Sequence, residues 1–184
     1  MKSHKLFAIT LMFGILGNFS PAFADYWCTV YTPRGSTVKD TMCMTYELTA
    51  AEIAANNQYV ANNYPNATRE TNSSRKYNCH SYAWYSQSTS NSVWIGYSTS
   101  TAEDIYWGDA SYIYKTYSSG NQSPPSSVPV GAKANYPSGN HSGIKASSTK
   151  IRSKWGKYPR MLHTPGYSPY VDTRINYYIL GLPG

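Results

Sequence analysis

The chain has 184 residues, of which 41% are hydrophobic, so it is long enough for one domain with a substantial core. It carries 16 basic and 9 acidic side chains, a formal net charge of +7, but only 14% of its residues are charged and 19 are tyrosine. This composition argues against a multidomain assembly. Beyond the N-terminus no apolar run reaches the roughly 18 residues of a membrane span, so we expect no transmembrane segment in the mature protein.

The N-terminal residues have the pattern of an export signal. Lys2 and Lys5 precede the apolar stretch 6–16, and Ala22-Phe23-Ala24 forms a small-x-small cleavage site. We therefore predict a signal peptide over residues 1–24 and one exported domain over residues 25–184. The predicted location is secreted or extracellular, with attachment to the cell wall as one option.

The three cysteines differ in their expected roles. Export permits disulfides, and Cys28 and Cys43 are close enough in sequence to close a short loop. That pairing leaves Cys79 without a partner, and an odd cysteine in a secreted protein is a liability, an intermolecular link or a working group.

Several elements can be predicted in chain order. Thr49 and Glu52 form a capping box, which predicts a helix from Ala50 to about Asn63. Asn78 is a good N-cap, which places Cys79 in the first turn of a second helix. Residues 86–127 are rich in Ser, Thr, Asn and Tyr, with aromatic anchors at Trp94 and Trp107. Residues 128–136 have the pattern of a turn that enters a strand, and further short strands are expected over 141–144, 150–155 and 175–180. The pattern predicts an α+β fold in which N-terminal helices pack on a small antiparallel sheet.

Positive charge is concentrated in the second half of the chain. No carboxylate lies between Asp109 and Asp172, whereas eight basic residues do: Lys115, Lys133, Lys145, Lys150, Arg152, Lys154, Lys157 and Arg160. Such a segment attracts anionic polymers. For an exported protein, anionic wall polymers are the expected partners, with the basic 145–160 segment as the contact, and nucleic acid is not expected.

Cys79 and His141 are the candidate catalytic pair. A thiol becomes a good nucleophile as thiolate, which a helix N-terminus and a nearby imidazolium both favour. Cys79 is expected at such a helix start, and His141 begins a strand after a glycine-containing turn. A cysteine on a helix followed by a histidine on a sheet is the order found in papain-like hydrolases. We expect the adjacent His80 to point away from Cys79.

Four segments carry a resemblance to a known family: YNCHSYAW at 77–84, GAKANY at 131–136, GNHSGI at 139–144 and SKWG at 153–156. They resemble a putative amidase domain of secreted bacterial proteins, similar to the NlpC-like and CHAP cysteine amidohydrolases that cut peptidoglycan. The resemblance covers about residues 45–170 and departs from the family pattern at Ala132 and Lys145. It implies a papain-like fold, with Cys79 as nucleophile and His141 as general base.

The third member of the site is left open. A group must orient the far nitrogen of His141, and no Asp, Glu, Asn or Gln follows His141 before Asp172. His163 is preferred, since a Cys-His-His arrangement is familiar in the NlpC-like group, and Ser153 or a backbone carbonyl is the alternative. The Cys79 backbone N–H, assisted by Tyr77 or Asn78, is the expected oxyanion donor.

The predicted function is a secreted cysteine amidohydrolase that cleaves a peptide or other amide bond, with cell-wall peptidoglycan as the substrate. We expect a monomer with no cofactor, and no metal, because no zinc-type spacing occurs. Two alternatives remain: a noncatalytic module that binds cell wall or glycan, and a toxin-like deamidase or transglutaminase that uses the same Cys-His chemistry.

Overall fold

The computed structural model describes residues 24–181, so the predicted signal peptide lies almost entirely outside the described residues. The first half holds β1 (Tyr26–Trp27), β2 (Val30–Tyr31), β3 (Thr37–Val38), β4 (Thr41–Cys43), α1 (Ala50–Asn63), β5 (Thr68–Arg69), η1 (Ser81–Tyr85), β6 (Val93–Ile95), η2 (Ala102–Asp104) and α2 (Ile105–Gly108). The second half holds β7 (Tyr112–Ser119), β8 (Lys133–Tyr136), β9 (His141–Lys145), β10 (Ile151–Lys154), β11 (Arg160–His163) and β12 (Arg174–Leu180).

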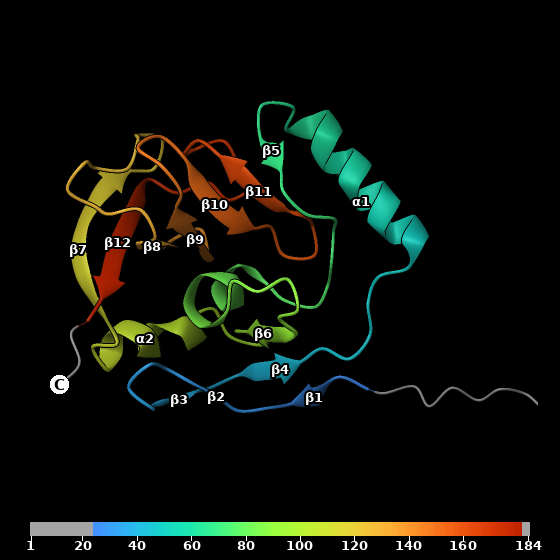
Figure 1. The fold of residues 1–184 in the computed structure, drawn as a ribbon, viewed down its shortest axis with the longest axis horizontal. Coiled ribbons are helices and arrows are strands. Elements are labelled where there is room, and N and C mark those ends of the chain that lie inside the picture. The colour runs from blue at the N-terminus through green and yellow to red at the C-terminus, as the bar shows by residue number, and fades with distance from the viewer. Residues whose placement is uncertain (1–23, 182–184) are drawn as a thin grey trace, which may run out of the picture.

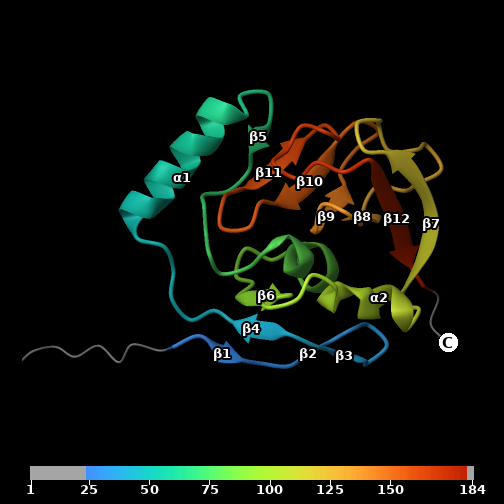
Figure 2. The ribbon, with the colours of Figure 1, turned by 180° about the vertical axis from the view of Figure 1, so that it is seen from behind.

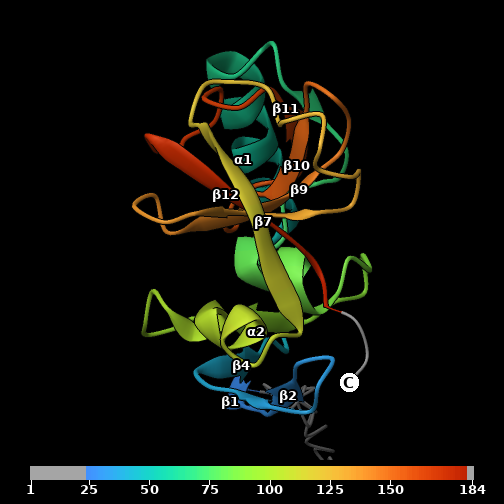
Figure 3. The same ribbon diagram turned by 90° about the vertical axis from the view of Figure 1, so that its left-hand side faces the viewer.

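A seven-stranded antiparallel sheet forms the centre of the fold, in the order β5-β11-β10-β9-β8-β12-β7. Two smaller sheets, β1-β4-β6 and β2-β3, lie below it in Figure 1. The side view in Figure 3 shows the helical turn of residues 79–85 between the large sheet and these N-terminal strands. The turn that carries the candidate nucleophile is therefore enclosed between two sheet layers.

The predicted papain-like α+β fold, with N-terminal helices packed on a small sheet, is wrong. The described residues contain twelve strands and only one helix longer than a few residues. Tyr112 to Ser119 form β7, in a region for which the sequence analysis predicted no strand. Their aromatic and β-branched side chains favour extended backbone, and the long partner β12 pairs along the whole of β7.

Individual helices and strands were predicted more accurately than the overall fold. Helix α1 has the predicted bounds, and both bonds of its capping box are present. The predicted turn and strand over 128–136 contain β8, and the predicted strands over 141–144, 150–155 and 175–180 correspond to β9, β10 and β12. Helix α1 projects at the outer edge of the molecule beside β5, and only Val60 of its side chains is buried (Figure 2).

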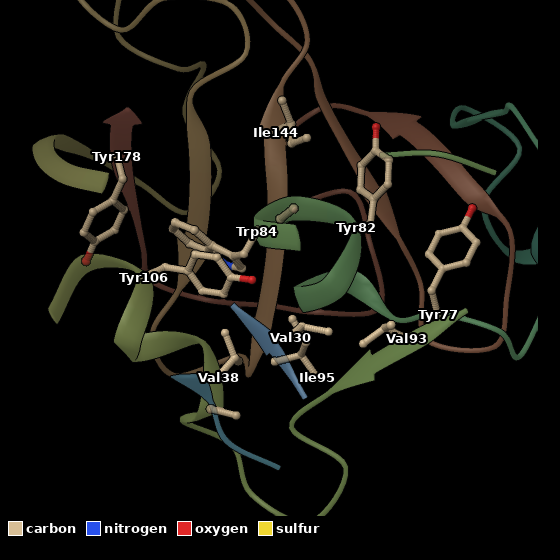
Figure 4. Packing of buried hydrophobic residues seen from close by; sticks show 12 residues of the cluster. Val30, Val38, Tyr77, Tyr82, Trp84, Val93, Ile95, Tyr106, Ile144 and Tyr178 are labelled. Atoms are coloured by element: carbon tan, nitrogen blue, oxygen red, sulfur yellow. The ribbon is translucent and has the colours of Figure 1, made fainter. Parts of the chain in front are cut away.

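The main hydrophobic cluster surrounds the 79–85 turn. Tyr82 and Trp84 from that turn pack with Ile95 of β6, Tyr106 of α2 and Ile144 of β9. Figure 4 shows the rings of Trp84 and Tyr106 facing each other in this cluster, and their centroids are 5.8 Å apart. This packing anchors the turn against β9, the strand that begins at His141.

A disulfide joins Cys28 and Cys43, as predicted, and connects the start of the described chain to the end of β4. Within residues 24–181, no helix combines the length and the apolar character needed to cross a membrane.

Candidate functional site

Cys79 stands at the start of a helical turn, as the sequence predicts. The Asn78 side chain accepts a hydrogen bond of 3.0 Å from the Ser81 N–H, which caps the turn. The same side-chain amide donates to the Ile95 carbonyl at 2.6 Å, so the cap is tied to β6. Cys79 is the one cysteine outside the disulfide, and its side chain is buried. Its position is thus fixed by the cap rather than by its own contacts.

His141 is held by aromatic rings. It pairs with Tyr136 across the β8–β9 hairpin, and the two ring centroids are 5.1 Å apart. The Tyr170 ring stacks flat on the imidazole, with centroids 3.8 Å apart and planes 5° apart. Neither ring nitrogen of His141 has a hydrogen-bond partner that meets normal geometry among the described residues. Stacking therefore sets the plane of this imidazole and leaves both nitrogens available.

The structure brings the Cys79 thiol into contact range of two imidazoles, His80 and His141. Burial raises the pKa of the thiol, but the charges of His80 and His141 and their short-range contacts outweigh burial and hold the thiol pKa well below its ordinary value. His141 acts on the thiol through its charge and a short-range contact, although neither of its ring nitrogens has a hydrogen-bond partner of normal geometry among residues 24–181. The arrangement favours a thiolate in the resting protein.

The sequence analysis missed the role of His80. We expected its side chain to lie on the helix surface, but it is 4% exposed and contacts the thiol. Burial lowers the pKa of His80, but the Cys79 thiolate and the Glu103 carboxylate raise it well above its ordinary value. The helical turn spans only residues 79–85, and residues 79–84 are buried between two sheets. His80 therefore does not lie on an exposed helix face. The sequence holds no local signal for the partner Glu103, which lies on η2.

His163 and Ser153, the two candidates for a third residue, bind each other. The His163 Nε2 and the Ser153 Oγ are 2.9 Å apart, and the His163 Nδ1 is 2.9 Å from the Thr164 carbonyl oxygen. The same Ser153 hydroxyl accepts a 2.9 Å hydrogen bond from the Trp155 indole. Both nitrogens of His163 are therefore engaged away from His141, and aromatic stacking takes the place of an acceptor on the far side of that ring.

The expected oxyanion helpers have other contacts. The Asn78 amide is used on both sides by the helix cap and by β6. Tyr77 is 3% exposed and lies near the Lys154 ammonium, 5.1 Å from ring centroid to Nζ. Their side chains are thus structural in this conformation, and the Cys79 backbone N–H is the remaining candidate donor.

The candidate pair is enclosed. Cys79 is 4% exposed and His141 is fully buried, with the half-buried Tyr170 as its cover. A cavity of about 250 Å³ is lined by Glu103, Asn140 and Tyr136, among others, but by neither Cys79 nor His141. A larger cavity, about 580 Å³, lies away from the pair between α1 and the β5–β11 edge. Access to the thiol requires movement of a covering group.

The basic residues of the 145–160 segment differ in exposure: Lys157 is exposed, and Lys150 and Arg152 are partly exposed. Lys145 and Lys154 are buried, and their ammonium groups donate to backbone carbonyls. Arg152 and Arg160 both bind the Glu70 carboxylate, at 2.7 and 3.0 Å. Glu70 precedes this segment by some 80 residues, so a count of charges along the local sequence could not include it. Lys145 and Lys154 therefore serve the interior of the fold, and the two arginines are paired with a carboxylate from β5's neighbour Glu70.

Among residues 24–181 no cluster of three or more His, Cys, Asp or Glu side chains is arranged to hold a metal ion. Comparison with known proteins adds no assignment: no family model, no curated protein and no solved structure matches this chain. The functional argument therefore rests on the geometry of the site.

Proposed function

We propose that this protein is a cysteine amidohydrolase in which Cys79 is the nucleophile and His141 transfers the proton. The observation that supports this is the position of the chain's one free thiol beside two imidazoles at a capped helical turn, with its pKa held well below the ordinary value. Structural buried cysteines have no such partners, and burial alone raises their pKa. A buried cysteine with a lowered pKa is therefore a candidate for chemistry.

The chemistry follows from these groups. The thiolate attacks an amide carbonyl carbon, and the Cys79 backbone N–H stabilises the oxygen that gains the negative charge. The protonated His141 then gives its proton to the leaving nitrogen, and a thioester with Cys79 remains. A water molecule deprotonated by His141 attacks the thioester, which releases the carboxylic acid and restores the thiolate. No step needs a further oxidant or reductant.

The closed state implies that Tyr170 moves during turnover. Its ring stacks on His141, with ring centroids 3.8 Å apart, and burial together with the negative charge of Cys79 raises the pKa of its hydroxyl. It belongs to an irregular segment between β11 and β12, which can move without breaking strand pairing. Displacement of this ring opens the pair to a substrate amide.

The proposed substrate is an amide bond in cell-wall peptidoglycan, in keeping with the family resemblance of the 77–84 and 139–144 segments. The experiment is digestion of purified peptidoglycan, with mass spectrometry of the released fragments. Wild-type protein is expected to release new amino and carboxyl ends, and Cys79→Ala is expected to release none while it unfolds at a similar urea concentration. Fragment release by folded Cys79→Ala would exclude the thiol mechanism, and modified glutamines in added proteins without wall digestion would favour a deamidase or transglutaminase.

A second candidate is a noncatalytic glycan-binding module. Trp27 and Tyr97 are 60% and 50% exposed, and their rings lie edge to face with centroids 5.9 Å apart. Exposed aromatic pairs of this kind can stack on sugar rings. A binding module would sediment with insoluble peptidoglycan. The Cys79→Ala variant of such a module would still bind, and its Trp27→Ala variant would not, whereas an amidohydrolase requires the thiol.

A further inference from the structure

His80 is enclosed by hydrogen-bond acceptors on both ring nitrogens. Its Nδ1 is 3.1 Å from the Glu103 carboxylate oxygen Oε1 and 3.0 Å from the Ser142 hydroxyl. Its Nε2 is 3.1 Å from the Asn140 side-chain oxygen. A neutral imidazole has one N–H, and only the imidazolium donates from both nitrogens. The surroundings of His80 therefore match the charged form of the ring.

These partners are themselves held in place. The Ser142 hydroxyl also accepts a 2.9 Å hydrogen bond from the Trp84 indole, so helical turn and β9 share this contact. Glu103 is 2% exposed, with His80 as the cation beside its buried carboxylate. A buried carboxylate is costly unless a positive group is paired with it. Glu103 and a charged His80 thus stabilise one another.

His141 differs from His80 in each of these respects. It has aromatic rings where His80 has a carboxylate, a hydroxyl and an amide, and its nitrogens have no aligned partner. Among its contacts in residues 24–181 there is no carboxylate that plays the part Glu103 plays for His80. Two imidazoles beside one thiol with such different environments can divide two tasks, one as a fixed charge and one as a proton carrier.

Other titratable groups near the pair do not replace His80. Four such groups interact with Cys79, His80 or His141: Lys154 on β10, Tyr170 in the segment after β11, Asp104 on η2 and His163 on β11. Burial lowers the pKa of Lys154 to about 7, and its ammonium donates to three backbone carbonyls. Burial lowers the pKa of His163 to about 4, which keeps that ring neutral. Neither is placed as His80 is, against both the thiol and a carboxylate.

We infer that His80, held by Glu103, is the positively charged positioning residue that keeps Cys79 as a thiolate, and that His141 is thereby left to transfer the proton. The division of labour rests on the proposed function, but the charge on His80 and the thiolate can be measured without turnover. The inference also assigns Glu103 a role, because its carboxylate is what keeps His80 charged.

The test is a pH titration of the thiolate by ultraviolet absorbance, with Cys79→Ala as the blank. His80→Gln and Glu103→Gln should each raise the thiol pKa by at least about one unit, seen as a shift of the whole thiolate titration curve to higher pH by that amount. His141→Gln should keep most of the thiolate and lose amide hydrolysis. Asp104→Asn is the matched control: Asp104 follows Glu103 on the same turn and interacts with His80 through charge alone, whereas Glu103 lies 3.1 Å from the His80 Nδ1, so this variant should shift the thiol pKa much less than Glu103→Gln.

Nitrogen NMR of the imidazoles gives a second readout, in which His80 should carry protons on both nitrogens at about pH 7. A thiolate that survives in Glu103→Gln, or one that disappears in His141→Gln but not in His80→Gln, would overturn the inference. Glu103→Gln preserves side-chain shape, so it decides the question even if His80→Gln fails to fold. A wild-type thiolate without amide hydrolysis would refute the proposed function alone, and hydrolysis with His80→Gln unchanged would refute this inference alone.

Discussion

His163 provides a measurable link between burial and stability. Its side chain is fully buried, and burial lowers its pKa to about 4 against an ordinary value of 6.5, although the bond to the Thr164 carbonyl opposes the change. Between these two pH values the unfolded chain takes up a proton and the folded chain does not. Stability from the neutral ring is therefore complete above pH 6.5 and is lost as the pH falls toward 4.

The size of the loss follows from the same two values. The interval from 6.5 to about 4, at about 1.4 kcal/mol for each pH unit, gives about 3 kcal/mol less free energy of unfolding. His80 does not contribute in this interval. Its folded pKa is raised above 6.5, so its stabilisation is already complete below that pH and is lost only as the pH rises through the folded value.

Urea unfolding at a series of pH values from about 7 to about 4 measures this slope. His163→Gln is the matched control, since an amide can replace the bond to Ser153 but cannot take up a proton. The wild type should lose stability steadily across the interval, and the variant should lose much less. Parallel curves for the two proteins would show that the buried imidazole is not the cause, and the assignment of His163 as a neutral structural residue would fail.

Three further predictions concern the cover, the core and the disulfide. Tyr170→Ala removes the covering ring and should increase the rate of iodoacetamide labelling of Cys79 at about pH 6 by about tenfold or more. Tyr170→Phe keeps the ring and should leave the labelling rate unchanged. Equal labelling rates for the two variants would mean that the Tyr170 ring does not limit access to the thiol. Ser153→Ala leaves one buried donor, the Trp155 indole N–H, and one buried acceptor, the His163 Nε2, without a partner; each lies 2.9 Å from the hydroxyl. Urea unfolding should therefore show a loss of about 2–5 kcal/mol with the thiolate titration unchanged, and a loss below about 1 kcal/mol would contradict this. Replacing Cys28 and Cys43 by serine opens a loop between two residues 15 positions apart and should lower the free energy of unfolding by about 3 kcal/mol in the same assay. The titration of Cys79 should not change. An unchanged free energy of unfolding would show that the disulfide does not stabilise the fold.

The elements near the site were predictable where a local rule decides them. The capping box predicted helix α1, and the Asn78 cap predicted the start of the turn at Cys79. The β8–β9 hairpin was predicted from its turn residues, and it brings His141 to the edge of the core. These predictions depend only on neighbours within a few positions in sequence, and the structure confirms them for that reason.

The overall architecture was not predictable in the same way. The polar composition of 86–127 concealed β7, which is a strand because β12 pairs with it over its whole length. The pairing of the basic residues in the 145–160 segment was not predictable for a similar reason. Arg152 and Arg160 look like free cations in sequence, yet both close on Glu70, and Lys154 is directed inward to carbonyl oxygens.

By itself the amino-acid sequence determined which groups could react: one cysteine left over from a short-loop disulfide, a capped turn that starts at it, and a histidine at the head of a strand. Only the tertiary structure decided how those groups are charged and covered. Glu103, Ser142 and Asn140 reach His80 from separate elements, and Tyr170 closes over His141 from a segment near the C-terminus. Electrostatic and stacking interactions act through space over a few ångströms, so their partners are set by the packing of the chain and not by distance along it.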